Sequence, residues 1–240
     1  MTWDWKPPGG YVYNNTWIPK FCEPDTRIDI QSCLKDTHIK IVGDSTTRQM
    51  VAMIKELCPC DGPENIMSVK HAVICVNKTS NFTLTYDLPP LPYVNFDSCR
   101  EYYKSFMERL DEIPDNERAI VVLVVYAHIL GYHSHVYLHS IKAMGQGVQR
   151  FVKRNLRAQV FIKGPHAYSF TNRTDHVSWM PDAYAYPYAQ LLYDVFKGLH
   201  DRVFYLNALD ITIATEQDFI HPDEYVVKEL VKQVLGFFCE

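Results

Sequence analysis

The apolar run from Ala119 to Tyr126 limits the possible folds more than any other segment of this chain. It is far shorter than the roughly 20 residues that a helix needs to cross a bilayer. A short run that is apolar at every position, rather than at alternate positions, is typical of a strand covered on both faces. Such strands lie inside sheets that carry helices on both sides, so we expect an α/β protein.

Segments with strand and helix patterns alternate on either side of this run. Further strands are expected at residues 38–42, 71–76, 83–86, 158–163 and 202–206, and helices over 50–57, 137–151, 188–199 and from Pro222 onward. Parallel strands need crossover connections, and alternating strands and helices supply them. We therefore expect a parallel sheet with helices on both faces and with its sites at the carboxyl ends of the strands.

The length of the chain suits one domain. Its 240 residues, 47% hydrophobic and 22% charged, fall within globular proportions, and α/β folds of this size often have a single core. Residues 1–35 are rich in Pro, Gly and aromatic residues and show no helix or strand period. We expect them to be a lead-in packed on one domain that spans residues 1–240.

The charge and the hydrophobic pattern exclude two classes of partner. A formal net charge of −4 and a pI near 6.2 offer no basic face for phosphate backbones, so we expect no nucleic acid. The longest apolar run is too short for a bilayer, so we expect no membrane span in this chain.

Cysteines and glycosylation sequons indicate an oxidising compartment. The chain has seven cysteines, whose spacing does not determine their pairing and whose odd number leaves at least one unpaired. Roughly one N-x-T sequon is expected by chance, but four are present, at Asn14, Asn77, Asn81 and Asn172. We expect a secreted or secretory-pathway protein, and a cytosolic protein with accidental sequons stays the alternative. Met1 begins no signal segment, so we expect an upstream segment to be missing or Met1 not to be the natural start.

A serine lies where the first strand of the predicted sheet passes into a helix. Ser45 follows Gly43-Asp44, and its hydroxyl would lie beside helix amides that can stabilise negative charge. A serine nucleophile needs a base, usually a histidine oriented by a carboxylate. Asp218 and His221 supply such a pair near the other end of the chain. The alternative is that Ser45 and His221 only cap the helices that they precede.

These motifs carry a family resemblance. Gly43-Asp44-Ser45 and Asp218-x-x-His221 resemble the GDS and DxxH signatures of the PC-esterase branch of the SGNH hydrolase superfamily. Over nearly its whole length the chain is similar to the C-terminal domain of the neurexophilin and PC-esterase (NXPE) family. Further matching positions are Gly10-Tyr11, Trp17 before Cys22, Cys33-Leu34, Thr46, Arg48-Gln49, Asp210-Ile211-Thr212, Pro222 and Cys239.

The resemblance implies a three-layer α/β/α domain of the secretory pathway, with a mainly parallel, flavodoxin-like sheet. It implies hydrolysis or transfer of carbohydrate O-acyl groups, O-acetyl groups above all, through an acyl-serine intermediate and without a metal or other cofactor. Ser45 would be the nucleophile, His221 the general base and then acid, and Asp218 the group that orients His221. The partners would be an acylated carbohydrate or glycoconjugate and, for transfer, an acyl donor.

The middle of the chain departs from the family pattern. Related domains have a Gly shortly before His128 and an Asn after the following strand, whereas this chain has Tyr126-Ala127-His128 and Lys163-Gly164-Pro165-His166. Losing one oxyanion donor typically costs about a hundredfold or more in rate. An inactive glycan- or protein-binding module on the same fold is therefore the alternative function. Candidates for oxyanion or substrate contact are Gly43, Asp44, Arg48, His128, Gly164 and His166.

Two other clusters have simpler interpretations. His133, His135 and His139 have a spacing that could suit a metal, but neutral histidines at a polar cleft or the surface explain them better. Cys58, Cys60, Cys75 and Cys99 do not have a zinc spacing, so disulfides are expected.

Overall fold

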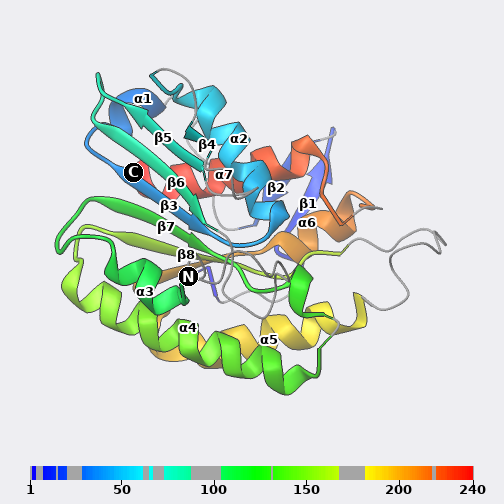
Figure 1. The fold of residues 1–240 in the computed structure, drawn as a ribbon. Coiled ribbons are helices and arrows are strands. Elements are labelled where there is room, and N and C mark those ends of the chain that lie inside the picture. The colour runs from blue at the N-terminus through cyan, green and yellow to red at the C-terminus, as the bar shows by residue number, and fades with distance from the viewer. Residues whose placement is uncertain are drawn as a thin grey trace.

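One sheet runs through the protein and carries helices on both faces (Figure 1). The computed structural model describes residues 2–3, 8–14, 16–20, 29–61, 65–66, 73–87, 104–130, 132–167, 182–217 and 220–239. Within these residues seven strands form the sheet in the order β4 (Asn65–Ile66), β5 (Val73–Asn77), β6 (Phe82–Asp87), β3 (His38–Val42), β7 (Ala119–Leu123), β8 (Gln159–Lys163) and β9 (Val203–Leu206).

The sheet is mainly parallel, as predicted. Strands β6, β3, β7, β8 and β9 are parallel neighbours, whereas β4 and β5 extend the β6 edge in antiparallel pairing. Val42 pairs with Asp87 of β6 on one side and with Leu123 of β7 on the other. The carboxyl ends of β3, β6 and β7 therefore meet at one edge, where ligand sites of parallel sheets are found.

Helices cover both faces of the sheet and complete a three-layer α/β/α arrangement (Figure 1). The longer helices of one face are α2 (Ser45–Leu57) and α7 (Glu224–Cys239). The opposite face carries α3 (Phe106–Asp111), α4 (Ser134–Arg154) and α5 (Ala185–Phe196). Shorter elements are α1 (Ile30–Cys33), α6 (Ala208–Ala214), η2 (Ala127–Ile129), η3 (Asp182–Tyr184) and η4 (Lys197–Leu199).

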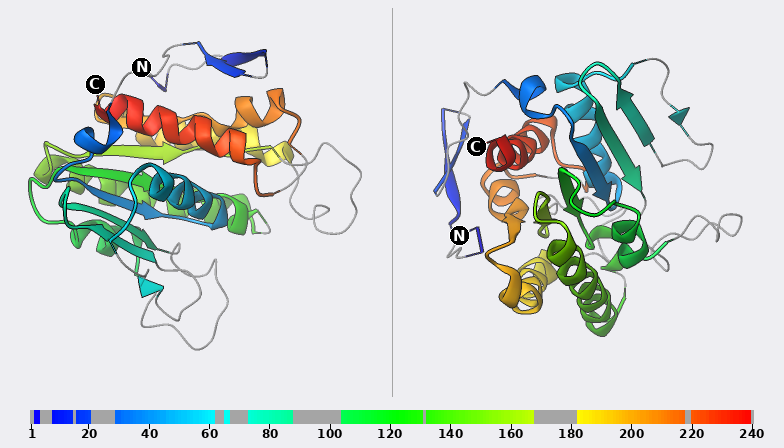
Figure 2. Two further views of the ribbon diagram at one scale, coloured as in Figure 1. Left: turned by 90° about the horizontal axis from the view of Figure 1, so that it is seen from above. Right: turned by 90° about the vertical axis from the view of Figure 1, so that its left-hand side faces the viewer.

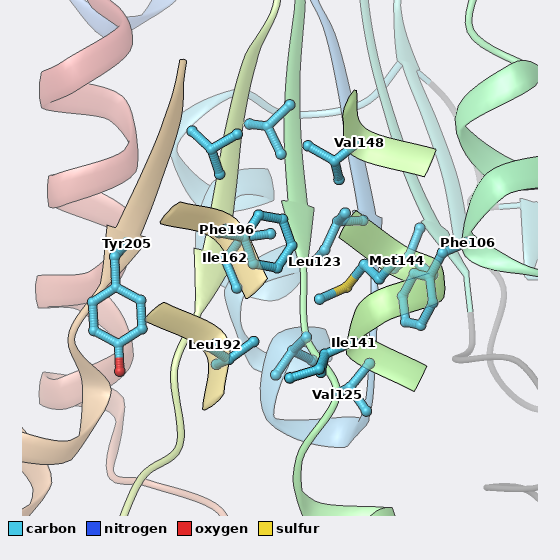
Figure 3. Close-up of a cluster of buried hydrophobic side chains, with 14 of the residues drawn as sticks. Phe106, Leu123, Val125, Ile141, Met144, Val148, Ile162, Leu192, Phe196 and Tyr205 are labelled. Carbon is cyan, nitrogen blue, oxygen red and sulfur yellow. The ribbon is translucent and has the colours of Figure 1, made fainter. Parts of the chain in front are cut away.

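The two faces of the sheet build two hydrophobic clusters. Every residue of β7 is buried, which confirms that this apolar run is a central strand. Val121 and Leu123 pack toward α3, α4 and α5, in the cluster shown in Figure 3. Ile120 and Val122 pack on the other side with residues of α2 and α7. Alternate side chains of one strand thus hold both helix layers.

Several predicted boundaries differ from the structure by a few residues, and two of the differences have a clear physical cause. The ladder of β7 ends at Leu123 rather than at Tyr126, because the chain turns away into η2. The last helix begins at Glu224 rather than at Pro222. The Pro222 carbonyl accepts a hydrogen bond from Gln49, and the Asp223 amide donates to Gln217, so side chains from outside the helix hold this backbone.

The lead-in contains regular structure that its sequence does not indicate. Strands β1 (Gly10–Tyr13) and β2 (Thr16–Pro19) form an antiparallel hairpin that lies alongside α6 and α7 (Figure 2). The Gly9 amide donates to the Asp210 carboxylate of α6 at 2.5 Å, and the Trp17 amide donates to the Tyr225 hydroxyl of α7. These strands are short and largely exposed, so they show no clear alternation.

Two disulfides are present in the described part of the chain. Cys33 of α1 is bonded to Cys239 at the end of α7, and Cys60 is bonded to Cys75 of β5. Cys58 is a free, buried thiol. Cys22 and Cys99 lie outside the described residues. The first disulfide links elements at the two ends of the fold, and the second closes a short local loop.

We predict that the double substitution Cys33→Ser/Cys239→Ser lowers the free energy of unfolding more than Cys60→Ser/Cys75→Ser does. The first bond spans 206 residues and the second spans 15, and loop-closure entropy makes the difference about 2 kcal/mol. Urea unfolding of both variants measures it. An equal loss in the two variants would contradict the prediction.

Candidate active site

The turn that carries Ser45 is held between three strand ends. The Gly43 amide donates to the Asp87 carbonyl at the end of β6, and the Val124 amide beyond β7 donates to the Val42 carbonyl. A Cβ atom on Gly43 would overlap the side chains of Val124 and Thr47. Only glycine lets β3 enter α2 this tightly, which explains the first residue of the Gly43-Asp44-Ser45 motif.

Asp44 is the N-cap of α2, so Ser45 is the first helical residue. The Asp44 carboxylate accepts from the Thr46 amide at 2.9 Å and from the Thr46 hydroxyl at 2.6 Å. Its other oxygen accepts from the Ala127 amide at 3.3 Å, beyond β7. A carboxylate is only an acceptor, so Asp44 shapes the turn and offers no proton to an oxyanion. The alternative that Ser45 is the cap of this helix is wrong.

A buried tyrosine supports the same turn from below. The Tyr86 hydroxyl, on β6, lies 3.0 Å from both the Gly43 and the Asp44 carbonyl oxygens and donates to them. Burial raises the pKa of Tyr86, so the hydroxyl keeps its proton. The Asp44 carbonyl also accepts from the amides of Thr47 and Arg48. Among the described hydrogen bonds, the Ser45 amide is thus the first-turn amide of α2 that does not donate to Asp44.

His221 reaches the serine from the far end of the chain. Its Nε2 atom lies 2.7 Å from Ser45 Oγ, across 176 residues of sequence. His221 is exposed and Ser45 is half-buried, so the pair is open to solvent. Asp218, expected to orient His221, lies outside the described residues. The structure thus brings together the two residues that the sequence motifs singled out at opposite ends of the chain.

The segment that carries His221 is clamped at its base. Gln217, nearly buried, accepts from the Asp223 amide at 2.7 Å and donates to the Asp223 carboxylate at 3.2 Å. Between these residues, the Ile220 carbonyl lies 2.9 Å from His166 Nε2. Side-chain hydrogen bonds therefore anchor the chain on both sides of His221.

His166 is fully buried and has a defined tautomer. Lys163 Nζ, also buried, lies 3.3 Å from His166 Nδ1. An ammonium group only donates, so Nδ1 accepts and the ring proton is on Nε2, which donates to Ile220. Burial, and next the Lys163 charge, lower the pKa of His166 to about 3. His166 therefore stays neutral at physiological pH.

The charges of Asp44 and Lys163 compensate one another in the interior. Burial alone would raise the pKa of Asp44, but the attraction of Lys163 and the hydrogen bond from Thr46 hold it below its usual value. Burial lowers the pKa of Lys163 to about 8, and Asp44 opposes this shift. The carboxyl ends of β3 and β8 are thus linked by opposite charges beneath the serine.

Several residues expected near the oxyanion are engaged elsewhere. The Gly164 amide donates to the Leu206 carbonyl at 3.0 Å and so continues the sheet. The Nε2 proton of His166 is donated to the Ile220 carbonyl, so His166 supports the chain next to His221. His128 and Arg48 are exposed side chains, in η2 and in the first turn of α2.

The sequons differ in their surroundings. Asn14 and Asn81 are exposed, with φ values of 47° and 51°, and the Asn81 amide donates to the Asp36 carboxylate at 2.9 Å. Asn77 is half-buried, and its amide donates to the Pro59 carbonyl at 2.9 Å. Asn172 lies outside the described residues. Their glycosylation stays a prediction.

The histidine cluster gives no sign of a metal site in the described part of the chain, which contains no group of three potential ligands. His133 and His135 stack on each other with ring centroids 4.9 Å apart.

A hollow of about 430 Å³ lies between α4 and α5, away from Ser45, and among its lining residues are Leu138, Gly145 and Leu191. No described helix is long and apolar enough to cross a membrane.

The sequence patterns did not identify the residues that hold the chain around Ser45 and His221. Lys163 is the last residue of the apolar strand β8. A charged residue at the end of a buried strand indicates a supporting role in a site, but only weakly. Gln49 carries no such signal, because its partner Pro222 lies 173 residues away in sequence. The contact of Gln217 with Asp223, six residues away, follows no helix or strand period. Helix α6 is also missed, although buried Thr212 in it accepts from the Ala167 amide at 2.8 Å and so fixes the segment after β8.

One family model covers most of the chain. The family model of NXPE family member 4-like proteins, C-terminal domain, matches residues 17–239. Among solved structures, a GDSL-like lipase from Parabacteroides merdae is 12% identical, with 84% of this chain and 96% of that chain covered and a TM-score of 0.46. A carbohydrate esterase family 2 enzyme with a carbohydrate-binding domain, from Corynascus thermopiles (Myceliophthora fergusii), is 14% identical, with 94% and 69% covered and a TM-score of 0.45.

We predict that His166→Gln flattens the acid dependence of stability. The pKa of His166 is about 3 when folded and near 6.5 when unfolded. Below pH 6.5 the unfolded chain therefore binds a proton that the folded protein does not. As the pH is lowered below 6.5, the free energy of unfolding therefore falls by up to about 1.4 kcal/mol per pH unit from this residue. Glutamine keeps a donor but does not titrate.

Urea unfolding of wild type and variant between about pH 7 and 5 measures this slope. His38, whose pKa burial lowers to about 4, should keep part of the slope in both proteins. Identical slopes in the two proteins would show that His166 is protonated equally in the folded and unfolded states.

Proposed function

Because the chain belongs to the family of NXPE family member 4-like C-terminal domains, we propose that it cleaves or transfers O-acyl groups of carbohydrates through a serine nucleophile. O-acetyl groups are the preferred acyl group in this proposal, and residues 1–240 act as one domain. The observation that carries it is the 2.7 Å contact between Ser45 Oγ and His221 Nε2. Nucleophile and base must lie within such a distance for acyl transfer.

In the first half of the reaction Ser45 Oγ attacks the acyl carbonyl. Its proton passes to His221 Nε2, which requires the tautomer with the proton on Nδ1. Asp218 is the residue proposed to accept that Nδ1 proton in a hydrogen bond. The tetrahedral intermediate collapses when His221 returns the proton to the leaving sugar oxygen. The products of this half are acyl-Ser45 and a free hydroxyl group.

The second half decides between hydrolysis and transfer. Water or a second sugar hydroxyl attacks the acyl group, and His221 takes its proton. Collapse breaks the ester bond to Ser45 and returns the proton to Ser45 Oγ. An exposed His221 and a half-buried Ser45 admit either acceptor. The fate of the acyl group therefore depends on which hydroxyl reaches the site.

The oxyanion would be stabilised mainly by the N-terminus of α2. The Ser45 amide lies in the first turn and, among the described hydrogen bonds, does not donate to the capping Asp44. Helix N-termini favour negative charge. His128 and Arg48 are candidates for a second contact, because each lies at the carboxyl edge of the sheet and is exposed.

The setting that we propose for this activity is the secretory pathway or the extracellular space. Two disulfides within the described residues fit an oxidising compartment. The proposed partners are acylated glycans or glycoconjugates and, for transfer, an acyl donor. The carbohydrate esterase among the similar structures is named for such a substrate.

A binding module without turnover is the second candidate. It is favoured by the two expected oxyanion donors, Gly164 and His166, that are engaged elsewhere. In that case the fold and the Ser45–His221 contact would remain, but an acyl-serine would not form.

We predict that a fluorophosphonate probe labels wild-type protein at Ser45 and that Ser45→Ala and His221→Ala abolish both labelling and cleavage of acetyl esters. Loss of nucleophile or base typically costs 10⁴-fold or more, or roughly 5 kcal/mol of transition-state stabilisation. Gel fluorescence of the probe and release of acetate measure the two signals.

Ser140→Ala and His135→Ala serve as matched controls. Ser140 donates to the Val136 carbonyl within α4, and His135 is an exposed histidine of the same helix, so neither should change labelling. Absence of both signals from correctly disulfide-bonded wild type would favour the binding module. Labelling that survives Ser45→Ala would place the nucleophile elsewhere.

A further inference from the structure

Side chains hold both peptide carbonyls that flank His221. The Ile220 carbonyl, before it, accepts from His166 Nε2 at 2.9 Å. The Pro222 carbonyl, after it, accepts from Gln49 Nε2 at 2.8 Å. The two donors come from the segment after β8 and from α2, so the chain at His221 is tied to two separate elements.

Gln49 relates this anchor directly to the nucleophile. Ser45 and Gln49 lie four residues apart on α2 and therefore on one face of that helix. One rigid element thus holds both the serine hydroxyl and the carbonyl next to the base. A shift of α2 would move the hydroxyl and the His221 backbone together.

The His166 anchor is made reliable by its surroundings. Lys163 donates to Nδ1 and so leaves the proton on Nε2, where Ile220 accepts it. Tyr126 packs its ring edge-to-face against His166, with centroids 5.4 Å apart. His166 is fully buried, so it does not exchange its partner for water. Its orientation and its tautomer are both determined by protein groups.

We propose that His166 and Gln49 are positioning residues, which hold the two carbonyls flanking His221 and so fix His221 Nε2 on Ser45 Oγ. The inference rests on the proposed function, because it assigns these residues to the same nucleophile and base. Neither residue touches the reacting atoms. Lys163 acts one step further away, by setting the tautomer of His166.

Removing either anchor should slow acylation of Ser45 more than it weakens substrate binding. His166→Leu and Gln49→Leu are expected to lower the labelling rate of Ser45, and kcat for acetyl esters, by about 10- to 100-fold with KM nearly unchanged, because a misplaced base costs about a hundredfold. His166→Gln should retain most of the rate, because its amide group occupies the place of Nε2 and can still donate. His166→Asn, whose amide takes the place of Nδ1, should not.

Two other residues of the chain make matched controls. Gln159 Nε2 donates to the Phe237 carbonyl at 3.0 Å, and Gln49 and Gln159 both have a buried Oε1 without a partner in the described residues. His200 Nε2 lies 3.2 Å from the Tyr193 carbonyl. Gln159→Leu and His200→Leu remove equivalent hydrogen bonds at a distance from Ser45. They should lower stability without changing the labelling rate, and urea unfolding checks that each variant is folded.

Histidine NMR separates failure of this inference from failure of the proposed function. Nitrogen shifts of the wild-type rings should show His166 protonated on Nε2 alone, and the side-chain amide of Gln49, which donates to the Pro222 carbonyl, should give resonances shifted from those of a free amide. These signatures without labelling of wild-type Ser45 would refute the enzyme and leave the anchoring intact. Wild-type labelling rates in both leucine variants, or an equal fall in Gln159→Leu, would overturn the positioning role.

Discussion

The buried carboxylate of Asp44 is the interaction on which the arrangement of the site depends. A charge without partners in a protein interior costs several kcal/mol. Here the carboxylate is compensated by the amide and hydroxyl of Thr46, by the Ala127 amide and by the charge of Lys163. These partners belong to α2 and to the ends of β7 and β8. Satisfying one charge therefore draws together the strand ends that surround Ser45.

Buried groups also connect the Asp44 carboxylate to the chain around His221. Lys163 is attracted by Asp44 and donates to His166, and His166 in turn donates to the Ile220 carbonyl. The serine and the histidine are thus fixed by one connected set of buried groups rather than by their mutual contact alone. Connected polar groups of this kind orient a site when every member has its partner.

The features that depend on residues close together in the sequence were predicted from it. The central apolar strand, the strand-to-helix turn at Ser45 and the histidine after the last strand are all visible in short windows of sequence, and the structure contains each of them. The supports of the site were not predictable in this way. Gln49 and Pro222 meet across 173 residues, and the bond between Cys33 and Cys239 follows from the packing of α1 on α7. Such pairings exist only once the sheet has formed.

The most direct test of the account is to trap the acyl-serine. Wild-type protein is mixed with an activated acetyl ester, quenched in acid within the first turnover, and digested for peptide mass mapping. We predict one acetyl group on the peptide that contains Ser45, which disappears as the ester is consumed. Acetylation confined to other residues, or none at Ser45 in folded and disulfide-bonded protein, would contradict the assignment of Ser45 as nucleophile.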